Sequence, residues 1–265
     1  MEEQLLICEK KERVCTLVLN RPERRNALNI LMLSQLIDTL ERIREEGEVR
    51  CVVIRGAGDK AFSSGYDISD IPTNPTPQQT AALKSQSPFH GALKAVLDFP
   101  FPVIAMINGH AFGAGFDLAM TCDLRIAAEN TQMGLPPVKL GIIYQTEGIL
   151  RMINTVGLAY AKEIFFTGRS YPAPKAKEMG LVHYVLPQDQ LASFTYEMAR
   201  EISENAPLAL KGMKVIFNKI FLSQKLDPKD VEEIAALRLQ AFNSEDIKEG
   251  QRAFKEKRKP VFKGR

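Results

Sequence analysis

The stretch INGHAFGAGFDLAMTCDLRIA, residues 107–127, combines the end of one apolar run, a glycine-rich turn and the start of a second apolar run. The first run, residues 101–109, predicts a buried strand, and a helix is expected from about residue 113. The second run, residues 123–128, predicts another strand. Two strands joined by a helix favour a parallel sheet, because parallel strands need a crossover connection.

The same alternation extends toward the N-terminus. Residues 13–19 and 51–58 read as buried strands, and the apolar run CVVIRGAG at 51–58 is typical of a parallel sheet covered on both faces. Residues 30–46 have apolar side chains at helical spacing, and a further helix is expected around residues 89–98. Residues 72–88, rich in proline and glutamine, are expected to form a loop.

Helices are expected to dominate from residue 145 onward. Asp227, followed by proline, and Ser244, followed by two acids, each have the pattern of a helix start. We therefore expect an α/β core in residues 1–200 and a helical C-terminal region in residues 201–265.

Composition excludes several classes of protein. The chain has 265 residues, of which 45% are hydrophobic and 25% charged, so global disorder is excluded. A net charge of +3 gives no reason to expect a nucleic-acid partner, and no apolar stretch approaches the length of a membrane span. The four cysteines have no CxxC spacing and there are three histidines, so no metal site is predicted. With no apolar leader at the N-terminus, we expect a cytoplasmic protein with free thiols.

Two segments of small residues follow predicted strands, AFSSGYDI at 61–68 and NGHAFGAGFD at 108–117. Small residues let a ligand approach the backbone, and the first N–H groups of a helix carry positive partial charge. Two such N–H groups could converge on one oxygen and form an oxyanion hole. The alternative is that these glycines serve tight packing only, which composition alone favours.

Four segments carry a resemblance to a known family: LNRPERRNALN (19–29), AFSSGYDI, INGHAFGAGFDLAMTCDLRIA and AFKEKRKPVF (253–262). Together they resemble the enoyl-CoA hydratase/isomerase (crotonase) family. The resemblance implies an α/β spiral of ββα repeats with a C-terminal helical trimerisation region. It further implies an acyl-CoA thioester substrate, assembly as a homotrimer or dimer of trimers, and no cofactor beyond the CoA of the substrate.

The resemblance also implies roles for particular residues. The backbone N–H groups of Tyr66 and Ala114 would be the two oxyanion-hole donors. The positions that match CoA-contacting residues of the family are Arg24, Arg25, Ala27, Ser64, Phe254 and Lys257. For the two arginines, ordinary exposed surface charge is an equally good interpretation.

The chain departs from the hydratase pattern at both carboxylates. Hydratases of this family use two glutamates as acid and base. Asp117 matches the first and is one methylene shorter, whereas Pro137 matches the second and cannot titrate. Hydration by a carboxylate pair is therefore unexpected unless another acid, such as Glu147, replaces the missing one.

Decarboxylation needs no base, because loss of CO₂ leaves the electron pair of an enolate behind. Residues 137–144, PVKLGIIY, and the C-terminal segment resemble the decarboxylases of this family that act on methylmalonyl-CoA. By that match Tyr144 is the expected proton donor or carboxylate-orienting group; the alternative is a packed tyrosine. Those decarboxylases carry histidine where this chain has Tyr66.

Two further functions stay open. A hydratase or isomerase, or a thioester hydrolase, could use Asp117 alone as acid and base. A non-catalytic acyl-CoA-binding scaffold could keep the fold and lose the chemistry. His110, directly before the second small-residue segment, is expected to be buried and structural.

Overall fold

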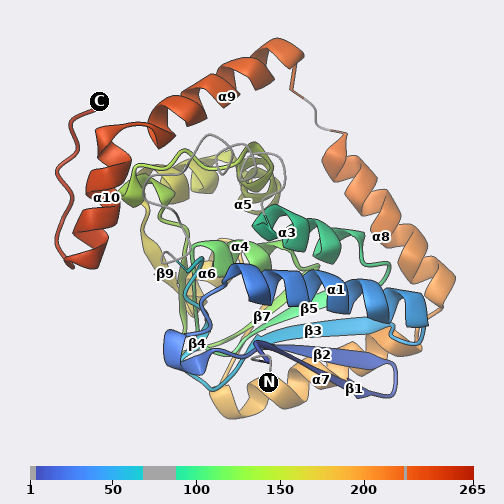
Figure 1. Ribbon diagram of the computed structural model, residues 1–265. Helices are drawn as coiled ribbons and strands as arrows, with labels where there is room; N and C mark the ends of the chain where they lie inside the picture. Colours follow the sequence, from blue (N-terminus) through green and yellow to red (C-terminus); the bar gives the residue numbers. More distant parts are fainter. Residues whose placement is uncertain (1–3, 68–87, 224–225) are drawn as a thin grey trace. The chain divides into compact units, whose positions relative to one another are not determined.

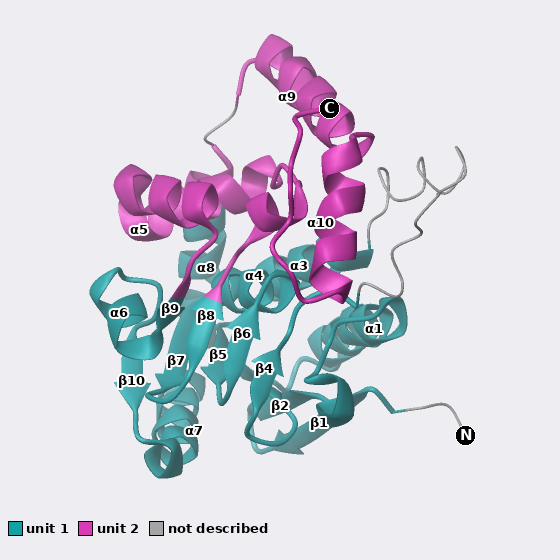
Figure 2. Cartoon of the chain, turned by 90° about the vertical axis from the view of Figure 1, so that its left-hand side faces the viewer, with its two compact units in different colours: residues 1–133, 171–218 teal, residues 134–170, 219–265 magenta. Residues whose placement is uncertain are grey.

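The computed structural model describes residues 4–67, 88–223 and 226–265. Its contacts group the chain into two compact units, residues 1–133 with 171–218 (unit 1) and residues 134–170 with 219–265 (unit 2), coloured separately in Figure 2. Both units are therefore assembled from segments distant in the sequence.

Unit 1 is built on a six-stranded sheet with the order β1-β2-β3-β5-β7-β10. Only β1 and β2 pair antiparallel, and all other neighbours run parallel. The strands are β1 (Leu6–Lys11), β2 (Val14–Leu19), β3 (Cys51–Gly56), β5 (Val103–Ile107), β7 (Leu124–Ala128) and β10 (Tyr184–Leu186). Every residue of β5 is buried, as expected for a parallel strand covered on both faces.

Helices cover both faces of this sheet (Figure 1). One face carries α7 (Gln188–Glu204), whose Leu191 and Ala199 pack in a core cluster with Val53 and Ile104. On the other face lie α1 (Ile30–Glu46) and α3 (Pro88–Asp98), which pack against each other, and α4 (Ala114–Thr121). The other helices in the described part of this unit are η1 (Pro22–Arg24), α6 (Ala173–Glu178) and α8 (Pro207–Leu222).

A second, four-stranded sheet has the order β4-β6-β8-β9. Its strands are short: β4 (Ala61–Ser63), β6 (His110–Phe112), β8 (Gln132–Gly134) and β9 (Ser170–Pro172). Each long strand β3, β5 and β7 is followed by one short strand, and β3–β4 and β5–β6 are followed by helices α3 and α4. This arrangement confirms the expected spiral of ββα repeats.

Unit 2 contains a short 3-10 helix, η3 (Pro137–Leu140), and the helices α5 (Thr146–Thr167), α9 (Pro228–Phe242) and α10 (Glu245–Lys255). Helix α5 is interrupted at Gly157, whose φ of 77° is not helical. Gly250 of α10 lies against η3, where an added methyl group would come within 2.7 Å of the Leu140 carbonyl. The two elements therefore pack backbone to backbone.

The expected elements agree well with the structure. Helix α1 has the predicted bounds, and the side chains of Asp227 and Ser244 accept hydrogen bonds from the first turns of α9 and α10. Strand β1 was not predicted. The expected loop at 72–88 lies almost wholly outside the described residues. The division into 1–200 and 201–265 stays a prediction, because it separates roles and not compact units. Among the described residues, every helix is too short or too polar to cross a membrane.

Candidate active site

Two buried asparagines fix the ends of β3 and β5. Asn108 accepts a hydrogen bond from the Gly56 amide (2.9 Å) and donates to the Gly58 carbonyl (2.6 Å). Asn26 donates to the carbonyl oxygens of Ala57 and Ala61. Gly109 fits closely here, since a methyl group on it would come within 2.4 Å of the Ala61 nitrogen. These hydrogen bonds thus fix the backbone where β3 and β5 lead into two segments, 61–67 and 108–117.

These two segments meet at their glycines. A methyl group on Gly65 would lie 3.0 Å from the Phe112 carbonyl oxygen and 3.4 Å from the Ala114 nitrogen. Gly65 and Gly113 have φ of 107° and 52°, which side chains on L-residues disfavour. The amides that follow them, of Tyr66 and Ala114, are therefore carried by two backbones in direct contact.

The orientation of the Tyr66 amide follows from its peptide partner. The Gly65 carbonyl accepts a hydrogen bond from the Leu28 amide (2.8 Å), and the described chain contains no cis peptide bond. In a trans peptide the C=O and N–H groups point in opposite directions. The Tyr66 N–H is therefore directed away from the segment that holds Leu28.

Ala114 is the first residue of α4, and no side chain caps the helix at Gly113. The first amides of a helix lack intrahelical acceptors and carry positive partial charge. Packing accounts for Gly115, because a methyl group there would come within 2.4 Å of the Ser63 side chain. Tight packing therefore explains the glycine at position 115. The positive φ of the backbone explains the glycines at positions 65 and 113.

Asp117 lies in the first turn of α4 and is 5% exposed. Its amide donates to the Gly113 carbonyl (3.0 Å), so the carboxylate is tied to the same turn that presents Ala114. A negative charge near a helix N-terminus is stabilised by the helix dipole. This buried acid therefore lies in the same helical turn as the candidate donor of Ala114.

The expected CoA-contacting residues of unit 1 lie together where the 24–27 turn meets Ser64. The Ser64 amide donates to the Arg25 carbonyl (3.0 Å) and its hydroxyl to the Arg24 carbonyl (3.3 Å). Both arginines and Ser64 are exposed, and Ala27 is buried beneath them. The structure therefore brings four of the six expected residues together.

Sequence analysis missed an ion pair beside this turn. Arg21 Nη1 lies 2.9 Å from Asp67 Oδ2, and the side chains are 13% and 12% exposed. The two residues lie within the LNRP and SSGYD motifs, and 46 positions separate them. Their place in these motifs is a signal that each has a role, although it does not identify the partner.

Unit 2 holds the residues expected to set the reaction. Pro137 is buried at the start of η3. Tyr144 is half-buried, its ring 5.5 Å from that of Phe165, and Gly148 leaves room for it because a methyl group there would come within 2.4 Å of the ring. Glu147, in the first turn of α5, is exposed.

The C-terminal tail folds back along α10. Arg258 forms a two-pronged ion pair with Glu249, and Asp246 accepts the amides of Lys263 and Gly264. Arg258 holds the pKa of Glu249 at about 2, below its usual range. The expected CoA-contacting residues Phe254 and Lys257 are both exposed. The tail is thus held against α10 by these contacts.

The expectation for His110 is wrong in one respect. The side chain is exposed, although its Nδ1 accepts a hydrogen bond from the Gln132 amide (3.0 Å). His110 begins β6, where alternate residues face away from the core. Its position on a short strand, which the sequence did not predict, explains the error.

Cysteine chemistry has little support in the described part of the chain. None of the four cysteines forms a disulfide, and burial raises the pKa of Cys51 to about 12. Burial also raises the pKa of Cys15. A thiol with a raised pKa is a poor nucleophile. Among the described residues, no group of three histidine, cysteine or acidic side chains could hold a metal ion.

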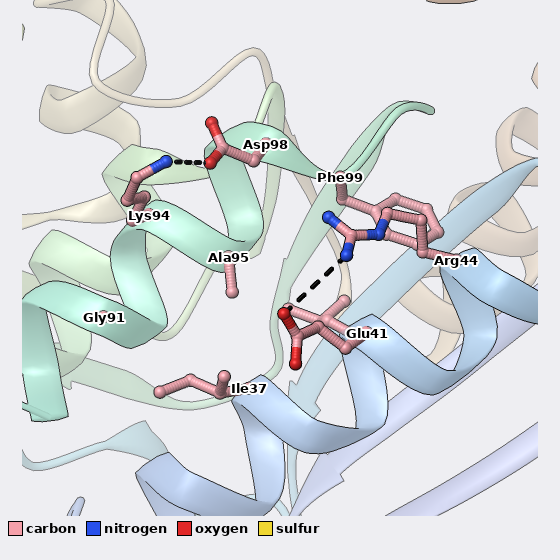
Figure 3. A pocket seen from close by; sticks show the side chains of 9 residues that line it. Ile37, Glu41, Arg44, Gly91, Lys94, Ala95, Asp98 and Phe99 are labelled. Carbon is pink, nitrogen blue, oxygen red and sulfur yellow. Dashed lines mark hydrogen bonds and ion pairs between the residues drawn. The ribbon is translucent and has the colours of Figure 1, made fainter.

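A shallow pocket of about 180 Å³ opens between α1 and α3 (Figure 3). Its charged rim is internally neutralised, since Arg44 pairs with Glu41 and Lys94 with Asp98. The lining residues are Ile37, Leu40, Glu41, Arg44, Gly91, Lys94, Ala95, Asp98 and Phe99. None of the candidate residues is among them, so we do not assign the chemistry to this pocket.

Comparison with known proteins identifies relatives over the whole chain. A family model described as enoyl-CoA hydratase/isomerase matches residues 9–265. The 2,3-dehydroadipyl-CoA hydratase of Escherichia coli (strain K12) is 36% identical over 263 residues, which cover 98% of this chain and 99% of the relative.

Two solved structures differ in how well they superimpose. Methylmalonyl-CoA decarboxylase in complex with 2-nitronate-propionyl-CoA gives a TM-score of 0.92 at 31% identity and covers 99% of both chains. An enoyl-CoA hydratase from Bacillus anthracis gives 0.77 at 35% identity, covering 99% of this chain and 100% of that one. The better structural match is therefore the one with the lower sequence identity.

Proposed function

The chain belongs to the enoyl-CoA hydratase/isomerase family, and we propose that it decarboxylates a methylmalonyl-CoA-like thioester. Membership of this family identifies the chain as an enzyme that processes acyl-CoA. The choice of reaction within the family is our inference. It is supported by the TM-score of 0.92 to a methylmalonyl-CoA decarboxylase that was solved with an acyl-CoA ligand.

One feature of the sequence carries the choice of reaction: by the family resemblance, Pro137 matches the second glutamate of the hydratases. A proline has no group that can activate water or return a proton. Pro137 is buried and opens η3, so its ring has a structural role there. A reaction that needs no general base suits this position, and decarboxylation is such a reaction.

In the proposed step the bond between the carboxylate carbon and the carbon next to the thioester breaks. CO₂ leaves, and the electron pair forms a thioester enolate. We assign the Tyr66 and Ala114 amides to the enolate oxygen, where preorganised N–H groups stabilise developing charge. Tyr144 is assigned as the proton donor that converts the enolate into the saturated thioester. No metal or redox cofactor takes part in this step.

A second candidate is hydration or isomerisation with Asp117 as the acid and base. The observation in its favour is the buried carboxylate in the first turn of α4, together with the hydratase that is 36% identical. One carboxylate can shuttle a proton in an isomerase. Hydration would need a second acid, and Glu147 is the acid that sequence analysis offered.

The CoA part of the substrate is assigned to Arg24, Arg25, Ala27 and Ser64 on one turn, and to Phe254 and Lys257 near the C-terminus. The exposed arginines and Lys257 can meet phosphate groups without loss of a buried partner. Neither nucleic acid nor a membrane is proposed as a partner. Four cysteines that form no disulfide suit a cytoplasmic location, which we also propose.

We propose assembly as a homotrimer or a dimer of trimers. Helix α8 exposes a run of large apolar side chains, among them Leu208 (85%) and Phe217 (68%). Apolar patches of this kind usually mark interaction sites. Light scattering coupled to gel filtration tests the assembly: a trimeric or hexameric mass is expected, and a monomeric mass would contradict it.

The test of the reaction uses two substrates in separate incubations. Purified protein is mixed with methylmalonyl-CoA or with crotonyl-CoA, and the products are followed by mass spectrometry. We expect propionyl-CoA from the first and no hydration of the second. Hydrated crotonyl-CoA without decarboxylation would instead support Asp117 as acid and base. Tight binding with no turnover of either substrate would support the acyl-CoA-binding scaffold.

A further inference from the structure

We propose that Arg21 and Asp67 are positioning residues that set the direction of the Tyr66 amide and so tune how strongly the site polarises a thioester carbonyl. The proposal deepens the function above and rests on it. Neither side chain is assigned to touch the substrate. Their effect is transmitted through the peptide groups on either side of Tyr66.

The contacts start at Arg21. Its Nη1 lies 2.9 Å from Asp67 Oδ2 and also donates to the Ala27 carbonyl at 2.9 Å. The Arg21 amide donates to the Asn26 side chain, and the Asn26 amide donates back to the Arg21 carbonyl. One guanidinium nitrogen therefore joins the 21–27 turn to the residue that directly follows Tyr66.

The peptides around Tyr66 are bound to the same strip of backbone. Leu28 donates its amide to the Gly65 carbonyl, and its carbonyl accepts the Asp67 amide, both at 2.8 Å. The Leu28–Tyr66 bridge thus holds the backbone by one hydrogen bond on each side of Tyr66. Asp67 contributes twice, through its backbone to Leu28 and through its carboxylate to Arg21.

The ion pair is placed where it can hold this geometry. At 13% and 12% side-chain exposure it is largely shielded from solvent, and charge-assisted hydrogen bonds are stronger than neutral ones. Gly65 has no side chain to restrict its φ and ψ. The Arg21–Asp67 link therefore adds a charged side-chain contact to the backbone bonds that Leu28 makes with the 65–67 segment. Small errors in donor direction are costly, because a displacement of about 1 Å can lower a rate about 100-fold.

The experiment uses hexadienoyl-CoA as a chromophoric probe, because polarisation of its conjugated carbonyl shifts its absorbance to longer wavelength. The full-length protein is compared with Asp67→Asn, Arg21→Met and Arg21→Lys. Glu178→Gln, which removes the exposed Lys175–Glu178 pair, is the matched control. The wavelength shift at saturation, the probe Kd, and kcat and KM for the substrate that is turned over are measured.

We expect Asp67→Asn and Arg21→Met to lose most of the wavelength shift and to lower kcat about tenfold, a smaller effect than removal of a whole oxyanion-hole donor. The probe Kd and KM should change less, by about threefold at most, since CoA contacts are retained. Arg21→Lys, which keeps the charge, should fall between wild type and Arg21→Met. The control should match wild type.

The outcomes separate the two claims. A full wavelength shift and unchanged kcat in Asp67→Asn, with a normal shift in wild type, would overturn the positioning role alone. A wild-type protein that binds the probe without any shift would overturn the proposed oxyanion hole and the positioning role with it. If Asp67→Asn does not fold, as judged by circular dichroism, Arg21→Lys decides the question from the other end of the pair.

Discussion

Segment 61–67 in unit 1 and segment 137–148 in unit 2 are built in opposite ways. In the first, the functional groups are backbone amides, and glycines and buried asparagines define the path of the chain. In the second, the groups of interest are side chains: a buried proline, a half-buried tyrosine and an exposed glutamate. The first segment can therefore change side chains without losing its amides, whereas the second changes its chemistry with each substitution.

This difference suits a family whose members carry out several reactions. Polarisation of a thioester carbonyl is common to decarboxylation, hydration and isomerisation, and in the proposed site two backbone amides supply it. The group that handles the proton differs among the reactions, and it is a side chain. Variants in the two segments should consequently impair different functions: carbonyl polarisation in the first segment and proton transfer in the second.

Ala114→Pro should have the largest effect, a loss of about 100- to 1,000-fold in kcat, because it deletes one donor of the oxyanion hole. The first position of a helix accepts proline, so the variant should fold. Ala114→Ser, which keeps the amide, is the control. Steady-state kinetics on both variants gives the comparison. Wild-type kcat in the proline variant would exclude this amide from the chemistry.

Tyr144→Phe should lower kcat for decarboxylation about 100-fold, the scale of a positioned proton donor. Tyr184→Phe is the matched control, because Tyr184 also packs its ring against a phenylalanine, Phe194, at 4.9 Å. Stopped-flow and steady-state rates are measured for both. Unchanged turnover in Tyr144→Phe would leave this residue with a packing role only.

Lys257→Ala should raise KM about five- to tenfold with little change in kcat, as expected for loss of one phosphate contact. The effect should vanish with an acyl-pantetheine substrate, which has no phosphates. Lys229→Ala, on the exposed side of α9, serves as the control. An equal KM increase with both substrates would contradict a phosphate contact.

Acidification should release the C-terminal tail. The pKa of Glu249 is lowered from 4.5 to about 2 by Arg258, so this ion pair stabilises the docked tail above pH 4.5. The contribution is lost as pH falls from there through about 2. Hydrogen exchange at the Val261 amide, which donates to Glu249, reports the change. Relative to an unfolded peptide at the same pH, the Val261 amide of Glu249→Gln should show low protection at every pH, whereas Glu232→Gln should behave as wild type. A wild-type protection factor that does not fall below pH 4.5 would refute the assignment.

Local patterns predicted most of the fold. The spacing of apolar residues in 30–46 and the capping side chains of Asp227 and Ser244 lie within single elements, so sequence alone was sufficient. Strand β1 was missed because Glu9, Lys10 and Lys11 make half of it charged, as an exposed edge strand allows.

The candidate site was predictable only in part. Tyr66 and Ala114 could be named because each follows a glycine in a recognisable motif. The approach of Gly65 to Gly113 and the Arg21–Asp67 pair could not, because they join residues 48 and 46 positions apart through the paths of several strands. Such contacts depend on the assembled sheets, which no local pattern encodes.

Decarboxylation in D₂O tests most directly whether the protein forms a thioester enolate by loss of CO₂. Methylmalonyl-CoA is incubated briefly with the protein, and the propionyl-CoA formed is analysed by mass spectrometry. If CO₂ loss yields an enolate that an exchangeable donor then protonates, the product carries one deuterium on the carbon next to the thioester. Absence of propionyl-CoA, together with hydration of crotonyl-CoA under the same conditions, would contradict the proposed reaction.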